Sequence, residues 1–182
     1  MKNIPLLIIF CLITAGCSSL GPKSDDVGKR TFGTKLDDRR TQSLAKRNIK
    51  AAHPGFKKAH FNITSFNGTV LVTGQVASAD MIEVASNVIE DMRNIKQIHN
   101  ELEVSGPISW PARRNDDWLK TKLKSAMVTN SKTDTNRIKV VVENGVVYLM
   151  GLLTREEGEA AVAQARKTYG VQKIVKVFEY IN

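Results

Sequence analysis

Two stretches of the chain share one pattern of hydrophobic and polar positions, 77 residues apart. The first reads Asn67-Gly-Thr-Val-Leu-Val-Thr-Gly-Gln-Val76, and the second reads Asn144-Gly-Val-Val-Tyr-Leu-Met-Gly-Leu-Leu153. An Asn-Gly pair is typical of a type I′ hairpin turn, because that turn needs positive φ at both central residues. In the strand that follows, Gly74 and Gly151 occupy the same position. A repeated glycine there favours a bulge or a close approach of the backbone.

The repeat extends on both sides of the hairpins. A strand-like segment precedes each turn, over 61–66 and 138–143. After each hairpin, apolar residues recur at helical spacing, namely Met81, Val84, Ala85, Val88 and Met92 in the first copy and Ala161, Val162, Ala165 and Tyr169 in the second. Thr154 and Glu157 form a capping-box pattern at the start of the second of these helices.

Each copy is completed at both ends. A strand is expected over 98–104 and again over 174–181, and a shorter helix leads each copy, over 44–52 and 116–128. Asp116 and Asp117 are expected to cap the second leading helix. The unit is therefore α-β-β-α-β and about 65 residues long, which is small but enough to fold alone.

This unit, with its Asn-Gly-x-Val-x-Leu-x-Gly hairpin, resembles the BON domain. The Gly-Leu-x-Thr-x-x-Glu run at 151–157 is the most specific part of the resemblance, which covers nearly all of the mature chain. The resemblance implies an α+β fold of two tandem BON domains. Each would be an α-β-β-α-β unit with a three-stranded mixed sheet and two helices on one face. It also implies a dual BON-domain lipoprotein of the Gram-negative outer membrane.

The N-terminal residues have the pattern of an export signal that ends in a lipidation site. Lys2 precedes an apolar run over 4–13, which is too short to span a bilayer. The sequence Thr14-Ala15-Gly16-Cys17 follows, and it is typical of a bacterial lipobox except that threonine stands where leucine is commonest. We expect a signal peptide over 1–16 and lipidation of Cys17. The alternatives are a plain secretory signal or a short membrane anchor.

The expected domain organisation follows from this N-terminus and from the repeat. Residues 17–40 are polar and are expected to form a lipidated flexible tether. The first BON domain is expected over 41–104 and the second over 116–182, with 105–115 as linker. Trp110 in that linker is expected to pack into a domain junction.

Ser18 follows the cysteine. In the lipoproteins that this chain resembles, aspartate at that position favours retention in the inner membrane. The resemblance therefore implies anchoring in the outer membrane, with the domains facing the periplasm. Three acyl chains would hold the protein firmly, since a single chain gives only marginal binding.

The net charge of +9 lies mainly in the second half of the chain. Residues 41–104 carry seven basic and six acidic side chains, whereas 116–182 carry eleven and eight. A basic protein suggests nucleic acid as a partner. The export signal argues against nucleic acid, and it leaves anionic phospholipid, lipopolysaccharide and acidic protein surfaces.

The leading helix of the second repeat places a tryptophan where solvent is expected. The core-facing stripe of that helix comprises Leu119, Leu123, Ala126 and Met127. Trp118 lies far around from this stripe, on the side of Lys122 and Ser125, while Lys120 and Lys124 flank the other edge. Tryptophan favours the lipid interface, and lysine and arginine attract anionic lipid. Alternatively, Trp118 covers the edge of its own sheet, or packs on the first domain or the linker.

In the proteins that this chain resembles, the first helix of the second BON domain contacts anionic phospholipid. The resemblance thus implies binding of phosphatidylglycerol or cardiolipin here, in support of outer-membrane integrity. The expected binding residues are Arg113, Arg114, Trp118, Lys120, Lys122, Lys124, Ser125 and Val128. The matching helix of the first repeat, over 44–52, has no aromatic residue and is interpreted as an ordinary solvated face.

Catalysis finds little support in the sequence. His53, His60 and His99 have no metal-ligand spacing, and no nucleophile or dinucleotide motif occurs. Cys11 lies in the expected signal and Cys17 would be modified, so the mature domains would carry no thiol. We expect no enzyme activity, cofactor or metal. The alternative function is a periplasmic adaptor that binds an envelope or outer-membrane protein assembly complex.

Overall fold

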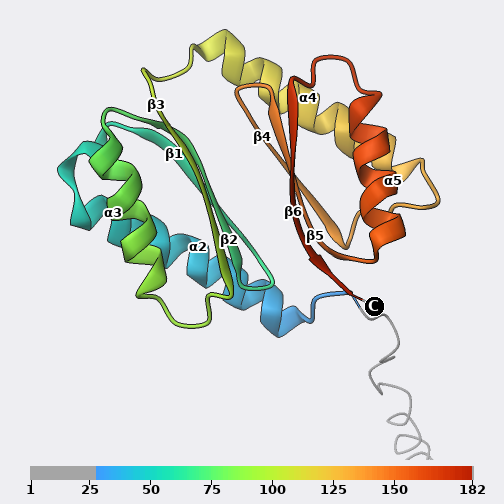
Figure 1. Cartoon of the computed structure of the whole chain (residues 1–182), viewed down its shortest axis with the longest axis horizontal. Helices are drawn as coiled ribbons and strands as arrows, with labels where there is room; N and C mark the ends of the chain where they lie inside the picture. The colour runs from blue at the N-terminus through green and yellow to red at the C-terminus, as the bar shows by residue number, and fades with distance from the viewer. Residues whose placement is uncertain (1–27, 182) are drawn as a thin grey trace, which may run out of the picture.

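A computed structural model describes residues 28–181 and contains two successive α-β-β-α-β units (Figure 1). The first unit comprises α2 (Phe32–Ala52), the 3-10 helix η1 (Pro54–Lys57), β1 (His60–Phe66), β2 (Thr69–Val76), α3 (Ala79–Glu90) and β3 (Gln97–Val104). The second comprises α4 (Trp110–Val128), β4 (Ile138–Glu143), β5 (Val146–Leu153), α5 (Arg155–Arg166) and β6 (Lys173–Tyr180). The expected signal peptide and Cys17 lie outside the described residues.

Each unit forms its own three-stranded mixed sheet. The strand orders are β1-β2-β3 and β4-β5-β6, in which the first pair is antiparallel and the second is parallel. Two helices cover one face of each sheet, so that the molecule has helices on its two outer sides and both sheets between them (Figure 1). The predicted α+β class and the tandem arrangement are confirmed.

Both Asn-Gly turns have the predicted backbone. Asn67 and Gly68 have φ of 54° and 82°, and Asn144 and Gly145 have φ of 50° and 75°. These are the two consecutive positive values that a type I′ turn requires. The turns connect strands whose pairing continues without interruption, from Phe66–Thr69 to His60–Gln75 in the first sheet.

An aspartate from the leading helix holds each turn. The Asp38 carboxylate of α2 accepts hydrogen bonds from the backbone nitrogens of Asn67 (3.0 Å) and Gly68 (3.3 Å). The Asp116 carboxylate of α4 accepts from the nitrogens of Asn144 (2.7 Å) and Gly145 (2.9 Å). The prediction that Asp116 caps its own helix is therefore wrong. It is a mid-helix residue that ties α4 to the β4–β5 hairpin.

Both leading helices begin earlier than predicted. Helix α2 begins at Phe32, where the Thr31 hydroxyl accepts from the nitrogen of Thr34 at 3.1 Å. Helix α4 begins at Trp110, where Ser109 caps the helix and a proline occupies the first turn. The polar composition of 32–40 concealed the helix, because few of its residues face the core. A side-chain cap and the Asp38 anchor accompany this first half in place of an apolar stripe.

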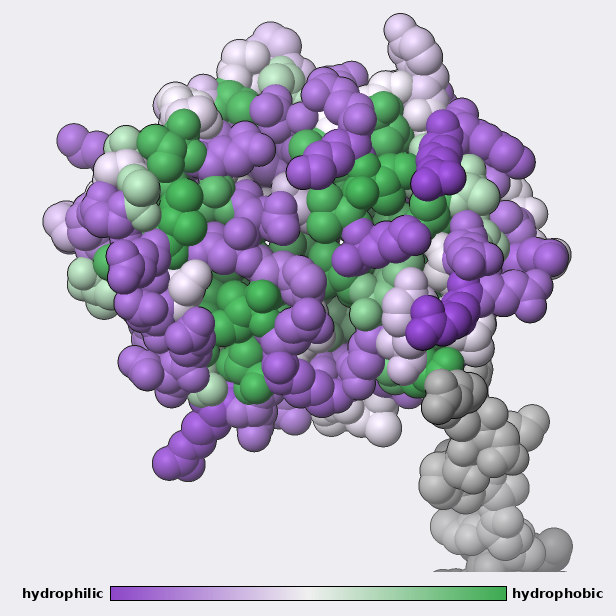
Figure 2. Space-filling model, in the orientation of Figure 1, coloured by the Kyte–Doolittle hydropathy of each residue, from purple (hydrophilic) through white to green (hydrophobic). Residues whose placement is uncertain are grey.

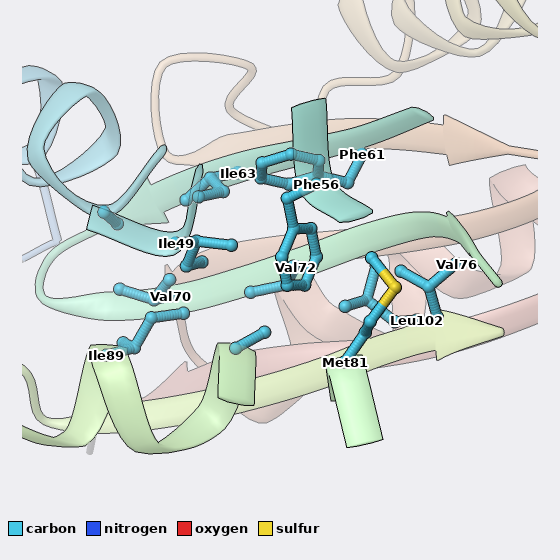
Figure 3. Packing of buried hydrophobic residues seen from close by; sticks show 12 residues of the cluster. Ile49, Phe56, Phe61, Ile63, Val70, Val72, Val76, Met81, Ile89 and Leu102 are labelled. Atoms are coloured by element: carbon cyan, nitrogen blue, oxygen red, sulfur yellow. The ribbon is translucent and has the colours of Figure 1, made fainter. Parts of the chain in front are cut away.

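Each sheet buries a separate core against its two helices. In the first unit Ile49, Phe56, Val72 and Met81 are among the buried side chains, which come from α2, η1, β2 and α3 (Figure 3). In the second, Leu119 and Leu123 of α4 meet Val147, Leu149 and Ala161. The predicted capping box is also present, because Thr154 accepts from the nitrogen of Glu157 and the Glu157 carboxylate accepts from that of Thr154.

The two sheets pack against each other through a third apolar cluster, which we call the interdomain cluster. Its buried members are Phe66 and Leu71 from the first unit and Val141, Tyr148, Met150 and Val177 from the second. Burial, followed by the charges of Glu101, Glu103 and Glu143, raises the pKa of the Tyr148 hydroxyl. Whether the domains pack together was left open by the sequence, and the structure shows that they do.

Polar contacts join the sheets around this cluster. The Glu143 carboxylate accepts from the amides of Asn62 (3.3 Å) and Gln75 (3.0 Å) and lies 3.5 Å from the His60 imidazole. At another edge, the Glu179 carboxylate accepts from the Asn67 amide at 2.6 Å and pairs with Lys96 at 3.2 Å. On the face drawn in Figure 2, hydrophilic side chains cover most of the surface, and apolar residues form separate patches.

Gly74 marks a close approach of two strands, as predicted. Its φ is +133°, and a Cβ placed there would lie 2.2 Å from the carbonyl oxygen of His60. A Cβ placed on Gly151, the counterpart of Gly74, would lie 2.7 Å from the carbonyl oxygen of Arg137. A backbone oxygen is the nearest atom at both positions, and at Gly151 the Leu153 side chain also lies as close as 2.9 Å to that Cβ, so backbone as well as side chains would have to shift.

We therefore expect Gly74→Ala to lower the free energy of unfolding by at least about 2 kcal/mol, because strain in a φ region closed to L-residues adds to the clash. Urea denaturation followed by circular dichroism measures the change. Gly106→Ala is the matched control, since a Cβ at Gly106 meets nothing within 4 Å. Equal stability of the two variants would contradict the close approach.

Candidate functional site

The outer surface of α4 presents large apolar side chains to solvent. Trp110 is 69% exposed, Trp118 54% and Val128 68%, although Leu119, Leu123 and Met127 of the same helix are fully or almost fully buried. At about 100° per residue, Trp110, Arg114, Trp118, Ser125 and Val128 lie within about 80° of one another around the helix axis. We call these five residues the α4 crest.

Cations stack on the aromatic rings of the crest. The Arg114 guanidinium lies 5.3 Å from the ring centroid of Trp110, and the Lys122 ammonium lies 4.8 Å from that of Trp118. Both pairs are spaced i, i+4, which places the two side chains on neighbouring turns. Each exposed ring therefore has a positive charge beside it, and cation–π attraction holds that charge in place.

Tyr169 extends this surface beyond the helix. It lies in the turn between α5 and β6, is 85% exposed, and has the Lys122 ammonium 5.9 Å from its ring centroid. Lys122 therefore stands between the rings of Trp118 and Tyr169. The turn is held against α4, because a Cβ on Gly170 would lie 3.7 Å from a methyl carbon of Leu119.

The predicted lysines lie on two flanks of the crest. Lys122 faces the Tyr169 turn, whereas Lys120 and Lys124 lie on the opposite flank, where their charges contribute to lowering the pKa of Lys139 on β4. Arg113 is only partly exposed, and its Nε is buried without a hydrogen-bond partner among residues 28–181. The eight predicted residues therefore form a crest with basic edges on both sides.

Two expectations about aromatic residues are wrong. Trp110 was expected in a domain junction, but the helix cap at Ser109 starts α4 one residue later and leaves the ring in solvent. Tyr169 was expected on the core stripe of α5, but that helix ends at Arg166 and its periodicity no longer applies. The Tyr-Gly pair was the available signal, since glycine with positive φ, here +100° at Gly170, commonly follows a helix end.

The first domain carries a weaker version of the crest. Phe32 is 82% exposed at the start of α2, and Leu36 follows one turn later on the same side. The expectation that this helix lacks an aromatic residue is wrong, because the helix includes Phe32. The position in α2 that corresponds to Trp118 lies 78 residues earlier and is Arg40. The central aromatic side chain is thus specific to the second domain.

Two of the three histidines, His53 and His60, have partners of structural rather than catalytic character. The Nδ1 of His53 accepts from the nitrogen of Gly55, and its Nε2 lies 3.4 Å from Asp80. His60 faces Glu143 across the sheets. Among residues 28–181 no group of three histidine, cysteine, aspartate or glutamate side chains is placed to hold a metal ion. In the same part of the chain, no helix combines the length and the apolar character needed to cross a bilayer.

Comparison with known proteins agrees with this architecture. Residues 37–106 and 115–182 each match the BON domain family. The chain is 33% identical over 153 residues to the outer membrane lipoprotein DolP of Haemophilus influenzae, covering 84% of this chain and 79% of that protein. It is 30% identical over 162 residues to the 21 kDa hemolysin of Actinobacillus pleuropneumoniae, covering 89% and 84%.

Among solved structures, the chain is similar to the C-terminal domain of CdsD, a structural protein of the type III secretion system of Chlamydia trachomatis. The identity is 9% and the TM-score 0.33, with 75% of this chain and 96% of that chain covered. Both repeats of the present chain match one family, and each match spans all of an α-β-β-α-β unit except the first turn of its leading helix. The chain therefore belongs to the BON domain family and carries two BON domains in tandem.

Proposed function

We propose that this protein is an outer-membrane lipoprotein, anchored through Cys17 and facing the periplasm, that docks the α4 crest on anionic phospholipid. Membrane docking by the second domain would support the integrity of the outer membrane. The similarity to a protein named outer membrane lipoprotein DolP supports the location. The lipidation site itself is inferred from the lipobox-like sequence that ends at Cys17.

One observation carries the docking proposal, namely the half-exposed Trp118 ring with the Lys122 ammonium 4.8 Å from its centroid. Indole rings favour the head-group region of a bilayer, because one edge is apolar and the other can donate a hydrogen bond. A lysine close to an anionic surface contributes on the order of 1 kcal/mol, screened by salt. Basic residues on both flanks of an aromatic crest fit a helix that lies flat on a charged membrane.

Liposome flotation of residues 18–182 tests this. We expect binding to vesicles containing phosphatidylglycerol or cardiolipin and no binding to phosphatidylcholine vesicles. Trp118→Ala and the double variant Lys122→Glu/Lys124→Glu should each weaken binding at least about tenfold, since a few kcal/mol of insertion and attraction are removed. Binding by the wild type should also fall as salt is added.

Lys50→Glu is the matched control, because Lys50 is an exposed lysine near the end of α2, the equivalent helix of the first domain. It reverses one lysine charge, which is half of the change made by Lys122→Glu/Lys124→Glu, without touching the crest, and it should bind like the wild type. Absence of wild-type flotation on anionic vesicles at moderate salt would refute docking. Losses in Lys50→Glu and in Lys122→Glu/Lys124→Glu that scale with the charge removed, with Trp118→Ala binding like the wild type, would show that net charge, and not the crest, causes binding.

A groove in the first domain favours a second candidate function, that of a protein-interaction adaptor. The groove has a volume of about 630 Å³ and is lined by residues that include Asp37, Arg40, Leu44 and Arg93. It lies between α2 and the turn before β3. The second domain has Leu119 at the position that corresponds to Thr41, which lines the groove. The larger Leu119 side chain lies against the equivalent turn, since a Cβ on Gly170 would be 3.7 Å from it.

An open groove with apolar and charged walls suits a peptide segment of an envelope protein. A photocrosslinking amino acid at Leu44, on the groove, compared with one at the exposed Lys50, tests this candidate. We expect a discrete crosslinked envelope protein from Leu44 only. Crosslinks of equal yield from both positions would contradict a specific partner in the groove.

A further inference from the structure

A second cavity lies at the seam between the two domains, and we call it the seam cavity. Its volume is about 230 Å³, and its walls combine Arg30, Lys35 and Arg39 of the first domain with Lys139 on β4 of the second. Asp38 is the one acidic side chain among its lining residues. Four cations thus surround a space of small-molecule size.

Asp38 offsets only part of this positive charge, through an ion pair with Arg30 and a weaker effect on Lys139. Its carboxylate already accepts from the Arg30 guanidinium (2.7 Å) and the Ser65 hydroxyl (2.8 Å), in addition to the two turn nitrogens. Four donors occupy its two oxygens, which is about the capacity of a carboxylate. The cavity therefore keeps an excess of positive charge after all of these bonds are counted.

Two nitrogen donors at the seam, the Nε of Arg30 and the Nζ of Lys139, make no hydrogen bond or salt bridge within residues 28–181. The Nε of Arg30 is buried and makes no hydrogen bond among residues 28–181. Lys139 forms no salt bridge to any carboxylate in that part of the chain. Burial is the largest cause that lowers the pKa of Lys139, and the charge of Arg30 is the next. A buried donor without a partner is costly, and two cations that repel each other add to that cost.

The repeat explains why this end of the interface lacks a carboxylate. With an offset of 77 residues, Lys139 corresponds to Asn62, and Glu143 corresponds to Phe66. Asn62 donates to Glu143 across the sheets. By the same symmetry, Lys139 would face a carboxylate if the first repeat had a glutamate at the position of Glu143. That position is Phe66 instead, and the Arg30 guanidinium lies 3.7 Å from the Phe66 ring centroid.

At one end of the interface the Glu143 carboxylate therefore accepts hydrogen bonds from the first domain, whereas at the other end basic side chains line a cavity.

We propose that the seam cavity binds a phosphate-class oxyanion, held by the Lys139 ammonium and the Arg30 guanidinium. A tetrahedral phosphate offers several acceptor oxygens to donors that come from two sides. The volume suits phosphate or a small phosphate ester, while acyl chains would have to remain outside. This site is separate from the α4 crest, and it does not depend on docking there.

NMR titration of ¹⁵N-labelled residues 18–182 with inorganic phosphate tests the site, against chloride at equal ionic strength. We expect saturable shifts of backbone amides in 30–42 and 135–139, and an increase in melting temperature with phosphate, because a ligand that binds only the folded state stabilises it. Lys139→Gln should weaken phosphate binding at least tenfold, and Lys139→Arg should retain it. Lys50→Gln, with its charge outside the cavity, should bind like the wild type.

Folding is checked in the same samples. Lys139→Gln should keep its melting temperature in phosphate-free buffer, because it removes a charge that lacks a carboxylate partner there. Glycerol 3-phosphate and dihexanoyl phosphatidylglycerol, titrated separately, distinguish the source of the phosphate group. Shifts with the short-chain lipid alone would assign the site to a lipid head group, and shifts with all three ligands to soluble phosphates. No saturable shift with any of them, or shifts unaffected by Lys139→Gln, would overturn the proposal.

Discussion

Replacing Asp38 with alanine should lower the free energy of unfolding by about 3 kcal/mol, because it leaves a partly buried guanidinium and several other donors without an acceptor. The Asp38 carboxylate joins α2 to the β1–β2 turn and to the segment that precedes the helix, through Arg30. Removing it therefore loosens three parts of the first domain at once. Urea denaturation followed by circular dichroism measures the effect.

Two variants provide the scale. Asp37→Ala changes the exposed neighbour of Asp38 and should alter stability by less than about 0.5 kcal/mol. Asp116→Ala removes the equivalent anchor of the second domain, which holds two backbone donors and no arginine, and its effect should lie between the other two. If Asp38→Ala were no worse than Asp37→Ala, the anchor would have no energetic role.

The Asp38 anchor also predicts a pH dependence. Burial raises the pKa of this carboxyl, but hydrogen bonds from Ser65, Asn67, Arg30 and Gly68 together outweigh burial and lower it below its ordinary value. A carboxyl whose pKa is lower in the folded state contributes stability above its unfolded pKa, and that stability is lost as the pH falls through the folded pKa. The stability difference between wild type and Asp38→Asn should therefore be constant near neutral pH and shrink below about pH 4.

Local sequence signals predicted the parts of the fold that depend on neighbouring residues. The Asn-Gly turns and the Thr154–Glu157 capping box each need only a few consecutive positions, and both are present as predicted. Asp116 could not be interpreted in this way, because its partners lie 28 and 29 residues away on the hairpin. Carboxylates near an expected helix start suggest caps, and only the three-dimensional arrangement shows the longer link.

The interdomain cluster shows the same limit. Leu71 and Met150 lie on predicted strands, but alternation alone does not tell whether the second face of a strand meets solvent or another sheet. In hindsight, the runs Val-Leu-Val and Tyr-Leu-Met indicate strands that are buried on both faces. For the crest, helical spacing placed Trp118 correctly away from the core, while Trp110 and Tyr169 depended on helix ends, which sequence patterns define poorly.

Packing between the sheets fixes the direction in which the crest points. The N-terminal segment contacts the second domain before it enters α2, because a Cβ on Gly28 would lie 2.4 Å from the Arg137 guanidinium. Gly28, the first described residue, therefore lies at the seam of the two domains, and α4 is held at a set orientation to that point through both sheets. If the crest docks on lipid as proposed, the two domains therefore approach the membrane together, because the second domain does not move independently of the first.

Leu71→Asp tests that coupling and should have the largest effect on the interface. Leu71 is 1% exposed within the interdomain cluster, and an unpaired carboxylate there cannot be solvated. We expect the free energy of unfolding to fall by at least about 4 kcal/mol and the two domains to lose their mutual protection. Hydrogen exchange measured by mass spectrometry should then become faster in β5, over 146–153, although the substitution lies in the other domain.

Val72→Asp supplies the comparison, because Val72 is the next residue along β2 and points to the opposite face, into the core of the first domain. It should destabilise the first domain as severely, with exchange increasing first in α2 and α3. Leu71→Asp should instead leave those helices protected while the facing strands β2 and β5 open together. The two substitutions differ only in the face of one strand, so they separate loss of a domain core from loss of the interface. Unchanged protection of β5 in Leu71→Asp would mean that the domains are stable without each other, and that the orientation of α4 is not set by the first domain.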